Sequence, residues 1–154
     1  IDPNEKDEAV LRKLGSTAIN LFLEGVPALK SLKEEINCYL SERDYLIGLD
    51  RRQLYCRSAF KGLNVLLQSA GAILMKQVVI NLNTALDKLG LVYGEDWMQL
   101  AMIHDEIQLA CLPEHKDLVM AQALDAFPAA QKFFKFACKI EGDAKIGYTW
   151  ADTH

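Results

Sequence analysis

Hydrophobic residues recur at helical spacing in three long stretches of the chain. The first stretch, 4–24, has acidic residues in its first turn, where they suit the positive end of a helix dipole. The second, 28 to about 43, is joined to the first only by Gly25-Val26-Pro27, so the two predicted helices should pack as neighbours. The third stretch, 59–89, has the longest apolar stripe, which predicts a buried central helix.

The stretch 97–111 predicts a β-hairpin whose tip is charged, because two apolar arms flank His104, Asp105 and Glu106. No glycine or Asn-Gly pair separates the arms, so this turn composition is less common than the usual hairpin loops. The second arm alternates with the period of two expected of a strand with one buried face: Ile107, Leu109 and Cys111 against Gln108 and Ala110.

Shorter patterns complete the expected elements. Residues 45–58 predict a small β-hairpin joined at 49–52, and a helix is predicted from 113 to about 127, ended or kinked by Pro128. Residues 135–141 alternate like a half-buried edge strand, and the tail 142–154 has no clear periodicity. The fold class is therefore α+β, with long amphipathic helices packed on a small antiparallel sheet.

Composition narrows the class of protein. The chain has 154 residues, 51% hydrophobic and 25% charged, which predicts one globular domain. The net charge of -4 argues against a free-standing nucleic-acid binder, although local patches can outweigh the total. The four cysteines form no CxxC pair, so the sequence indicates neither a zinc site nor a disulfide framework. The expected compartment is therefore a reducing cytosol. Neither a run of 18 apolar residues nor a secretory leader is present, so no membrane segment is expected, and a start at Ile1 hints at a fragment.

Three groups of residues are candidates for chemistry. Asp105 and Glu106, with His104 beside them, suit a divalent hard cation such as Mg²⁺, although a solvated polar turn has the same composition. Asn64 and Gln68 lie four apart on one helix face and could meet nucleic-acid base edges, or be simply exposed. A basic island with no acid could contact phosphates, or be only a solvated surface: Arg51, Arg52, Arg57 and Lys61.

Several stretches together resemble, in order and spacing, the C-terminal part of A-family (polymerase I-like) DNA polymerases, with the bacteriophage replicative branch most similar. Three of them carry most of the likeness: 49–52 followed by Arg57-Ser58, then 63–72, then 103–108. The segment 22–29 and the ending 150–154 resemble the same branch, so the likeness covers nearly the whole chain. The ordered combination is far more specific than any one motif.

The resemblance implies a role for each candidate residue. Asp105 corresponds to the palm carboxylate that binds the catalytic magnesium ions, with Glu106 in the same site and His104 near the terminal phosphate of the primer. Asn64 and Gln68 correspond to helix residues that reach the minor groove of the primer-template. Two-metal transfer needs carboxylates that hold ions roughly 3.5 to 4 Å apart, which agrees with an acidic hairpin tip. Further DNA contacts are expected from Arg51, Arg52, Arg57, Lys61 and His154.

The chain also departs from the family pattern. The second metal-binding aspartate and the fingers helix that holds the incoming dNTP have no counterpart, and they are expected upstream of Ile1. Phe60 stands where many relatives have Arg or His, and Arg51 replaces a glycine common in that turn. The isolated chain is therefore predicted to be inactive, and to need the remainder of the polymerase, primer-template DNA and dNTP.

The sequence thus predicts the palm and thumb-proximal fragment of a DNA-directed DNA polymerase, acting in a bacterial or phage-infected cytosol. Its single domain, 1–154, should comprise a helical hairpin (1–44), a small β-hairpin (45–58), a long helix (59–89), the catalytic hairpin (97–111), and a helix, edge strand and tail (113–154). One alternative is a separate or degenerate DNA-binding or structural module. Another is a small metal-dependent phosphohydrolase that uses His104 and Asp105. Such an enzyme needs further metal ligands, and the other two histidines, His115 and His154, are poorly placed in the sequence to supply them.

Overall fold

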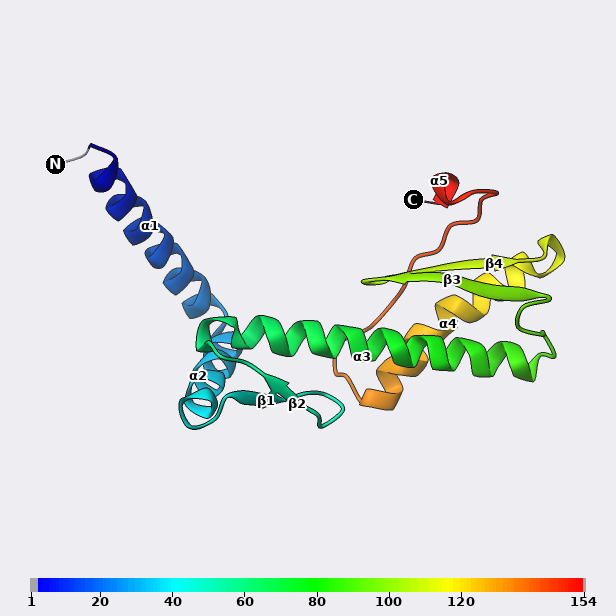
Figure 1. Cartoon of the computed structure of the whole chain (residues 1–154), viewed down its shortest axis with the longest axis horizontal. Coiled ribbons are helices and arrows are strands. Elements are labelled where there is room, and N and C mark those ends of the chain that lie inside the picture. Colours follow the sequence, from blue (N-terminus) through cyan, green and yellow to red (C-terminus); the bar gives the residue numbers. More distant parts are fainter. Residues whose placement is uncertain (1–2, 154) are drawn as a thin grey trace. The chain divides into compact units, whose positions relative to one another are not determined.

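The computed structural model describes the backbone of residues 3–153 and the side chains of residues 8–153. The chain divides into two compact units, Ile1–Leu67 and Gln68–His154, where the sequence predicted a single domain. The long helix α3, Ala59–Lys88, contributes its first turns to one unit and the rest to the other (Figure 1). The α+β class predicted from the sequence is confirmed.

The first unit contains two helices, a small hairpin and the start of α3. The helices end and begin at the predicted Gly-Val-Pro link, with Pro27 in the first turn of the second helix, where its missing N–H costs nothing. The hairpin is antiparallel, with Leu46 opposite Leu54. The elements before α3 are α1 (Pro3–Gly25), α2 (Pro27–Glu42), β1 (Tyr45–Ile47) and β2 (Gln53–Tyr55).

The core of the first unit joins α2, the hairpin and the start of α3. Ile36, Leu46 and Cys56 are buried there. Gly62 of α3 lies against α2 so closely that an added Cβ would be 2.5 Å from Cγ2 of Ile36 and 3.0 Å from Cδ1 of Leu40. The absence of a side chain at Gly62 therefore sets how closely these two helices approach.

The expected packing of α1 along α2 is wrong. Of the α1 side chains described, Leu23 alone reaches half-burial, and the apolar stripe predicted to be an inner face is exposed. Periodicity identified the helix correctly but could not identify a covering surface, because an amphipathic pattern specifies a face and not its partner. The exposed residues include Val10, Leu11, Leu14, Leu21 and Phe22.

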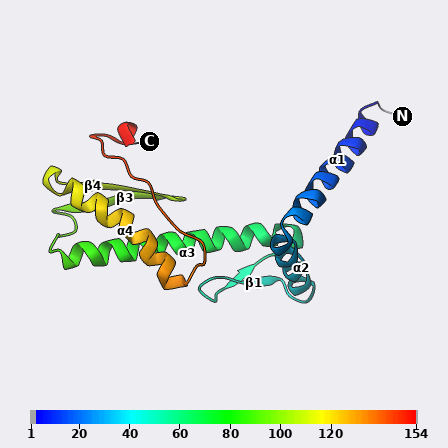
Figure 2. The same cartoon turned by 180° about the vertical axis from the view of Figure 1, so that it is seen from behind.

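In the second unit, a hairpin and a helix pack against the C-terminal part of α3 (Figures 1 and 2). Its elements are β3 (Trp97–Ile103), β4 (Glu106–Cys111), a 3₁₀ turn (Pro113–His115), α4 (Lys116–Phe134) and the short α5 (Trp150–Thr153). The core combines residues from all of the longer elements. Its buried members are Val78, Leu82, Leu86, Leu91, Trp97, Val119, Ala126 and Ala130.

The helix α3 is long and apolar enough, by length and composition, to cross a membrane. Val78, Leu82 and Leu86 are each at most 1% exposed and belong to the protein core. Packing against the hairpin and α4 therefore accounts for part of its apolar character without a bilayer.

Two expectations about the C-terminal part are wrong: the end of a helix near Phe127 and the strand at 135–141. Of the two effects predicted for Pro128, ending or kinking the helix, the first does not occur. The helix α4 continues through Pro128, because Ala126 and Ala130 on either side are buried in the core and outweigh one lost backbone hydrogen bond. Residues 135–141 form no strand. Lys135 ends α4 in the left-handed conformation at φ 57°, and the Ile140 amide donates to Oε1 of Gln131 at 2.9 Å, so the chain follows α4 rather than pairing with a strand.

The expected single antiparallel sheet is instead two separate two-stranded sheets within residues 3–153, β1 with β2 and β3 with β4. An alternating pattern predicts a half-buried strand but does not say which strand it pairs with. Each sheet is therefore stabilised by the helices of its own unit rather than by further strands.

Candidate catalytic hairpin and DNA-contact residues

The candidate catalytic residues lie at the closed end of the β3–β4 hairpin. Ile103 pairs with Glu106, which leaves His104 and Asp105 as a two-residue loop. His104 has φ 56°, and the hairpin turns that match strand twist need a positive φ at this first loop position. Histidine is one of the few non-glycine residues enriched there. Glu106 was predicted at the tip but is the first residue of β4.

The two faces of the hairpin have different surroundings. Ile107, Leu109 and Cys111 pack against the core of the second unit, as the alternation predicted, and burial raises the pKa of the Cys111 thiol. Glu106 and Gln108 lie on the opposite face, because successive strand residues alternate. The register shift between Gln99 and Ala101 keeps Trp97 on the core face opposite Cys111.

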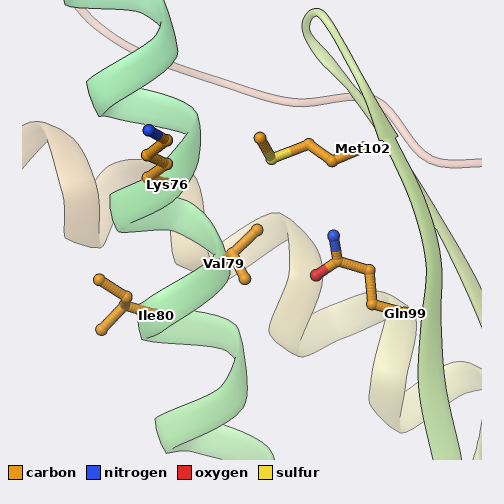
Figure 3. Close-up of a pocket in the computed structure, with 5 residues that line it drawn as sticks. All are labelled: Lys76, Val79, Ile80, Gln99 and Met102. Carbon is orange, nitrogen blue, oxygen red and sulfur yellow. The ribbon is translucent and has the colours of Figure 1, made fainter.

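A shallow hollow of about 410 Å³ lies between α3 and the core face of β3. Figure 3 shows Lys76, Val79 and Ile80 on the helix side and Gln99 and Met102 on the strand side. Its lining is mainly apolar, and its two polar side chains, Lys76 and Gln99, come from different elements. The lining therefore contains no cluster of metal-binding side chains. The acidic residues of the hairpin are not part of this hollow.

Asp105 is exposed, whereas Glu106 is half-buried and its carboxylate accepts a hydrogen bond from Nε2 of Gln108. An exposed carboxylate beside one already oriented by a neighbour fits a hard cation, because Mg²⁺ usually takes one or two protein carboxylates and completes its shell with water and phosphate. Across residues 8–153, no group of three or more His, Cys, Asp or Glu side chains could hold a metal. The hairpin itself offers two adjacent carboxylates, which fits part of a metal site.

The other end of the hairpin is anchored by Asp96, which the sequence analysis missed. Its Oδ2 accepts the Val92 amide at 2.7 Å, and its carbonyl accepts the Leu112 amide at 2.9 Å. Nε2 of His115 lies 3.7 Å from its Oδ1. The residue thus ties the chain before β3 to the chain after β4. An aspartate directly before a strand was the only signal available in the sequence.

The basic island lies in the loop of the first hairpin (Arg51, Arg52), just after β2 (Arg57) and in the first turn of α3 (Lys61), and two of its arginines have local partners. Nε of Arg52 lies 2.5 Å from Oδ2 of Asp50, and Nε of Arg57 donates to the Tyr55 hydroxyl at 2.8 Å. Desolvation would raise the pKa of Asp50, but the hydrogen bonds and charge of Arg52 together hold that pKa below its ordinary value. Arg51 has φ 66° at the loop. Its side chain and that of Lys61 form no ion pair among the residues described.

The candidate amides are exposed on α3. Asn64 and Gln68 are one helical turn apart, and Phe60, a further turn toward the N-terminus, is 87% exposed. The candidates thus form three groups: the hairpin tip in the second unit, the basic loop in the first, and one face of α3. His154 lies outside the described residues.

The fold is that of part of a DNA polymerase domain. The chain superposes with a TM-score of 0.67 on the POL domain of Pol1 from M. smegmatis, solved in complex with DNA primer-template and dNTP. The match covers 77% of this chain and 22% of that one, at 14% sequence identity, so it concerns the fold alone. No protein-family model matches the chain.

The particular relatives are bacteriophage enzymes. The chain is 35% identical over 150 residues to the DNA-directed DNA polymerase of Enterobacteria phage T3 and 34% identical to that of Escherichia phage T7, with 86% of this chain covered in each case. It is 31% identical over 157 residues to the enzyme of Escherichia phage Phieco32. It spans about a fifth of the length of these curated relatives. The chain is homologous to these phage polymerases, which confirms the family resemblance seen in its motifs.

Proposed function

We propose that this chain is the palm and thumb-proximal part of a DNA-directed DNA polymerase that extends a primer by nucleotidyl transfer. The observation that carries the proposal is the hairpin tip: a two-residue loop exposes Asp105 next to Glu106, at the position the polymerase motif assigns to metal binding. Homology to phage DNA polymerases supports the same reading of the tip. Free thiols at all four cysteines agree with action in the cytosol of a bacterial host.

Each residue at the tip has a distinct part in the proposed chemistry. Asp105 offers carboxylate oxygens to a cation from a loop held by paired strands, and Glu106 offers a second carboxylate whose orientation is restricted by Gln108. Two bound Mg²⁺ ions would activate the attacking 3′-hydroxyl and stabilise the leaving oxygens. His104, the first residue of the two-residue loop, is the candidate contact to the terminal phosphate of the primer, a role that the family resemblance implies. The remaining ligands and the dNTP-binding residues come from the remainder of the polymerase.

The DNA-binding part of the proposal concerns the primer-template. The exposed amides of Asn64 and Gln68 are suited to the minor groove, whose acceptors are nearly the same for all base pairs, so they test pair geometry rather than sequence. Phosphate contacts come from the basic island, with Arg51 and Lys61 the most available of its cations. His154 is a further candidate contact.

The test is Asp105→Asn in the complete polymerase. The amide keeps the size of the side chain but loses the charge that holds the cations, which is worth several kcal/mol at the transition state. Since 1.36 kcal/mol is a factor of ten in rate, we expect primer extension to fall by about a thousandfold or more. Primer-template affinity, measured separately, should change little.

The matched control is Asp125→Asn, the same replacement at an exposed position of α4. We expect this control to retain full primer extension. Wild-type activity in the Asp105→Asn polymerase would eliminate the catalytic assignment. Equal losses in the two variants would show that the effect of the replacement is not specific to the hairpin tip.

A further inference from the structure

We propose that Gln108 is a positioning residue for cation binding at the hairpin tip, because its side-chain amide holds the carboxylate of Glu106 in one orientation. This inference rests on the proposed function and gives a part in it to a residue that is not itself a metal ligand. Gln108 thereby sets how tightly Glu106, together with Asp105, binds a divalent cation.

The first observation is the contact between the two side chains. Nε2 of Gln108 donates a hydrogen bond to Oε1 of Glu106, and both residues are half-buried. The bond engages one of the two carboxylate oxygens, and each of these oxygens can accept more than one bond. Glu106 therefore keeps acceptor capacity for a cation while its side chain loses rotational freedom. Ordering a flexible side chain before its ligand arrives removes an entropic cost from binding.

The second observation is how β4 places the two side chains. Glu106 and Gln108 are two residues apart on the strand, so both project from the face of the hairpin opposite the core. The cross-strand partner of Gln108 is Ala101, whose small side chain leaves room beside the amide. Both Glu106 and Gln108 are paired with β3, so the strands fix the backbone from which donor and acceptor extend.

The third point is the charge of the donor. Carboxylates that bind metals are themselves commonly hydrogen-bonded, and loss of the orienting group weakens metal binding roughly 10- to 100-fold. A lysine or arginine at position 108 would orient the carboxylate but would also repel a cation. The amide of Gln108 is neutral, so it orients Glu106 without that repulsion.

The experiment measures cation binding by the complete polymerase on a primer-template whose primer ends in a dideoxynucleotide, so that no nucleotidyl transfer occurs. The probe is Mn²⁺, followed by electron paramagnetic resonance, because carboxylate sites that suit Mg²⁺ also suit Mn²⁺. Gln108→Met keeps the length of the side chain and removes the donor. We expect it to raise the dissociation constant of Mn²⁺ about tenfold, with the affinity for primer-template unchanged.

The Mg²⁺ dependence of primer extension gives a second measurement. Gln108→Met should need about tenfold more Mg²⁺ for half-maximal extension, while its rate at saturating Mg²⁺ approaches that of the wild type. A lower rate at every Mg²⁺ concentration, with unchanged Mn²⁺ affinity, would show a merely structural role and overturn the inference. Gln99→Met is the matched control, because it makes the same replacement at a half-buried position on the core face of the hairpin. It should leave both cation constants unchanged.

Glu106→Gln tests whether Gln108 acts through Glu106. Adding Gln108→Met to this variant should weaken Mn²⁺ binding no further, because the carboxylate that Gln108 orients is already lost. A further tenfold loss would overturn the inference. So would wild-type Mn²⁺ binding by Gln108→Met alongside weak binding by Asp105→Asn, and the proposed function would then stand. If Glu106→Gln and Asp105→Asn both bind Mn²⁺ like the wild type, the metal-binding role in the proposed function fails as well.

Discussion

At the scale of single residues, both hairpin loops contain a non-glycine residue in the left-handed conformation, Arg51 at φ 66° and His104 at φ 56°. The family motif indicated that a glycine is common at position 51, and the structure gives the reason, since only glycine adopts this φ without steric cost. Strain of this kind persists where the side chain is needed, and phosphate binding is the use proposed for Arg51.

The prediction at this scale is that Arg51→Gly stabilises the chain. Relief of the left-handed strain should raise the free energy of unfolding by about 1 kcal/mol. Arg51→Ala is the control, because it removes the same charge and keeps the Cβ, and it should leave the free energy unchanged within about 0.5 kcal/mol. Denaturant unfolding of the three chains measures the difference. Equal stability of the glycine and alanine variants would show that the loop is not strained.

At the scale of elements, the sequence predicted what depends on local periodicity. The two N-terminal helices, both hairpins and α3 were predicted within a few residues of their observed ends, because apolar spacing and the Gly-Val-Pro link act locally. The missing strand at 135–141 and the continuation of α4 through Pro128 depend on tertiary partners, Gln131 and the core around Ala126 and Ala130, which no local pattern encodes. The hairpin tip was predicted from its motif, whereas the bond from Gln108 to Glu106 required a structure.

The prediction at this scale concerns Gly62, which no sequence pattern singled out. Gly62→Ala would place a Cβ 2.5 Å from Cγ2 of Ile36, so α2 and α3 must move apart, at a cost of about 1–3 kcal/mol in unfolding free energy. Gly71→Ala is the control on the same helix, since nothing lies within 4 Å of the added Cβ. That control should stabilise the helix by roughly 0.5–1 kcal/mol.

Thermal or denaturant unfolding of both variants measures these opposite changes. If Gly62→Ala is as stable as Gly71→Ala, the close approach of α2 and α3 at this residue is not what sets their packing. Asn64 lies two residues, about 200°, further along α3, so its outward orientation would then lose its structural basis.

At the scale of the whole molecule, the long helices α1 and α3 differ sharply in how far their apolar side chains are buried. The apolar stripe of the helix α1 is exposed to solvent, and so is its ion pair between Arg12 and Glu8, at 2.6 Å. An exposed pair at this spacing adds only about 0.3–0.5 kcal/mol. By contrast, Val78, Leu82 and Leu86 of α3 are at most 1% exposed.

The prediction at this scale is a steep difference in amide hydrogen exchange between the two helices of this 154-residue chain. Most of the stability of a helix in a protein comes from tertiary packing of its apolar face, and the apolar face of α1 is exposed, so α1 amides should exchange within seconds at neutral pH. Amides around Val78 and Leu82 should open only when the second unit unfolds, and so exchange orders of magnitude more slowly. Mass spectrometry of peptides from 8–24 and 75–86 measures both in one experiment. Protection of α1 equal to that of α3 would mean that its apolar stripe is covered in solution, and that α1 is part of a packed core.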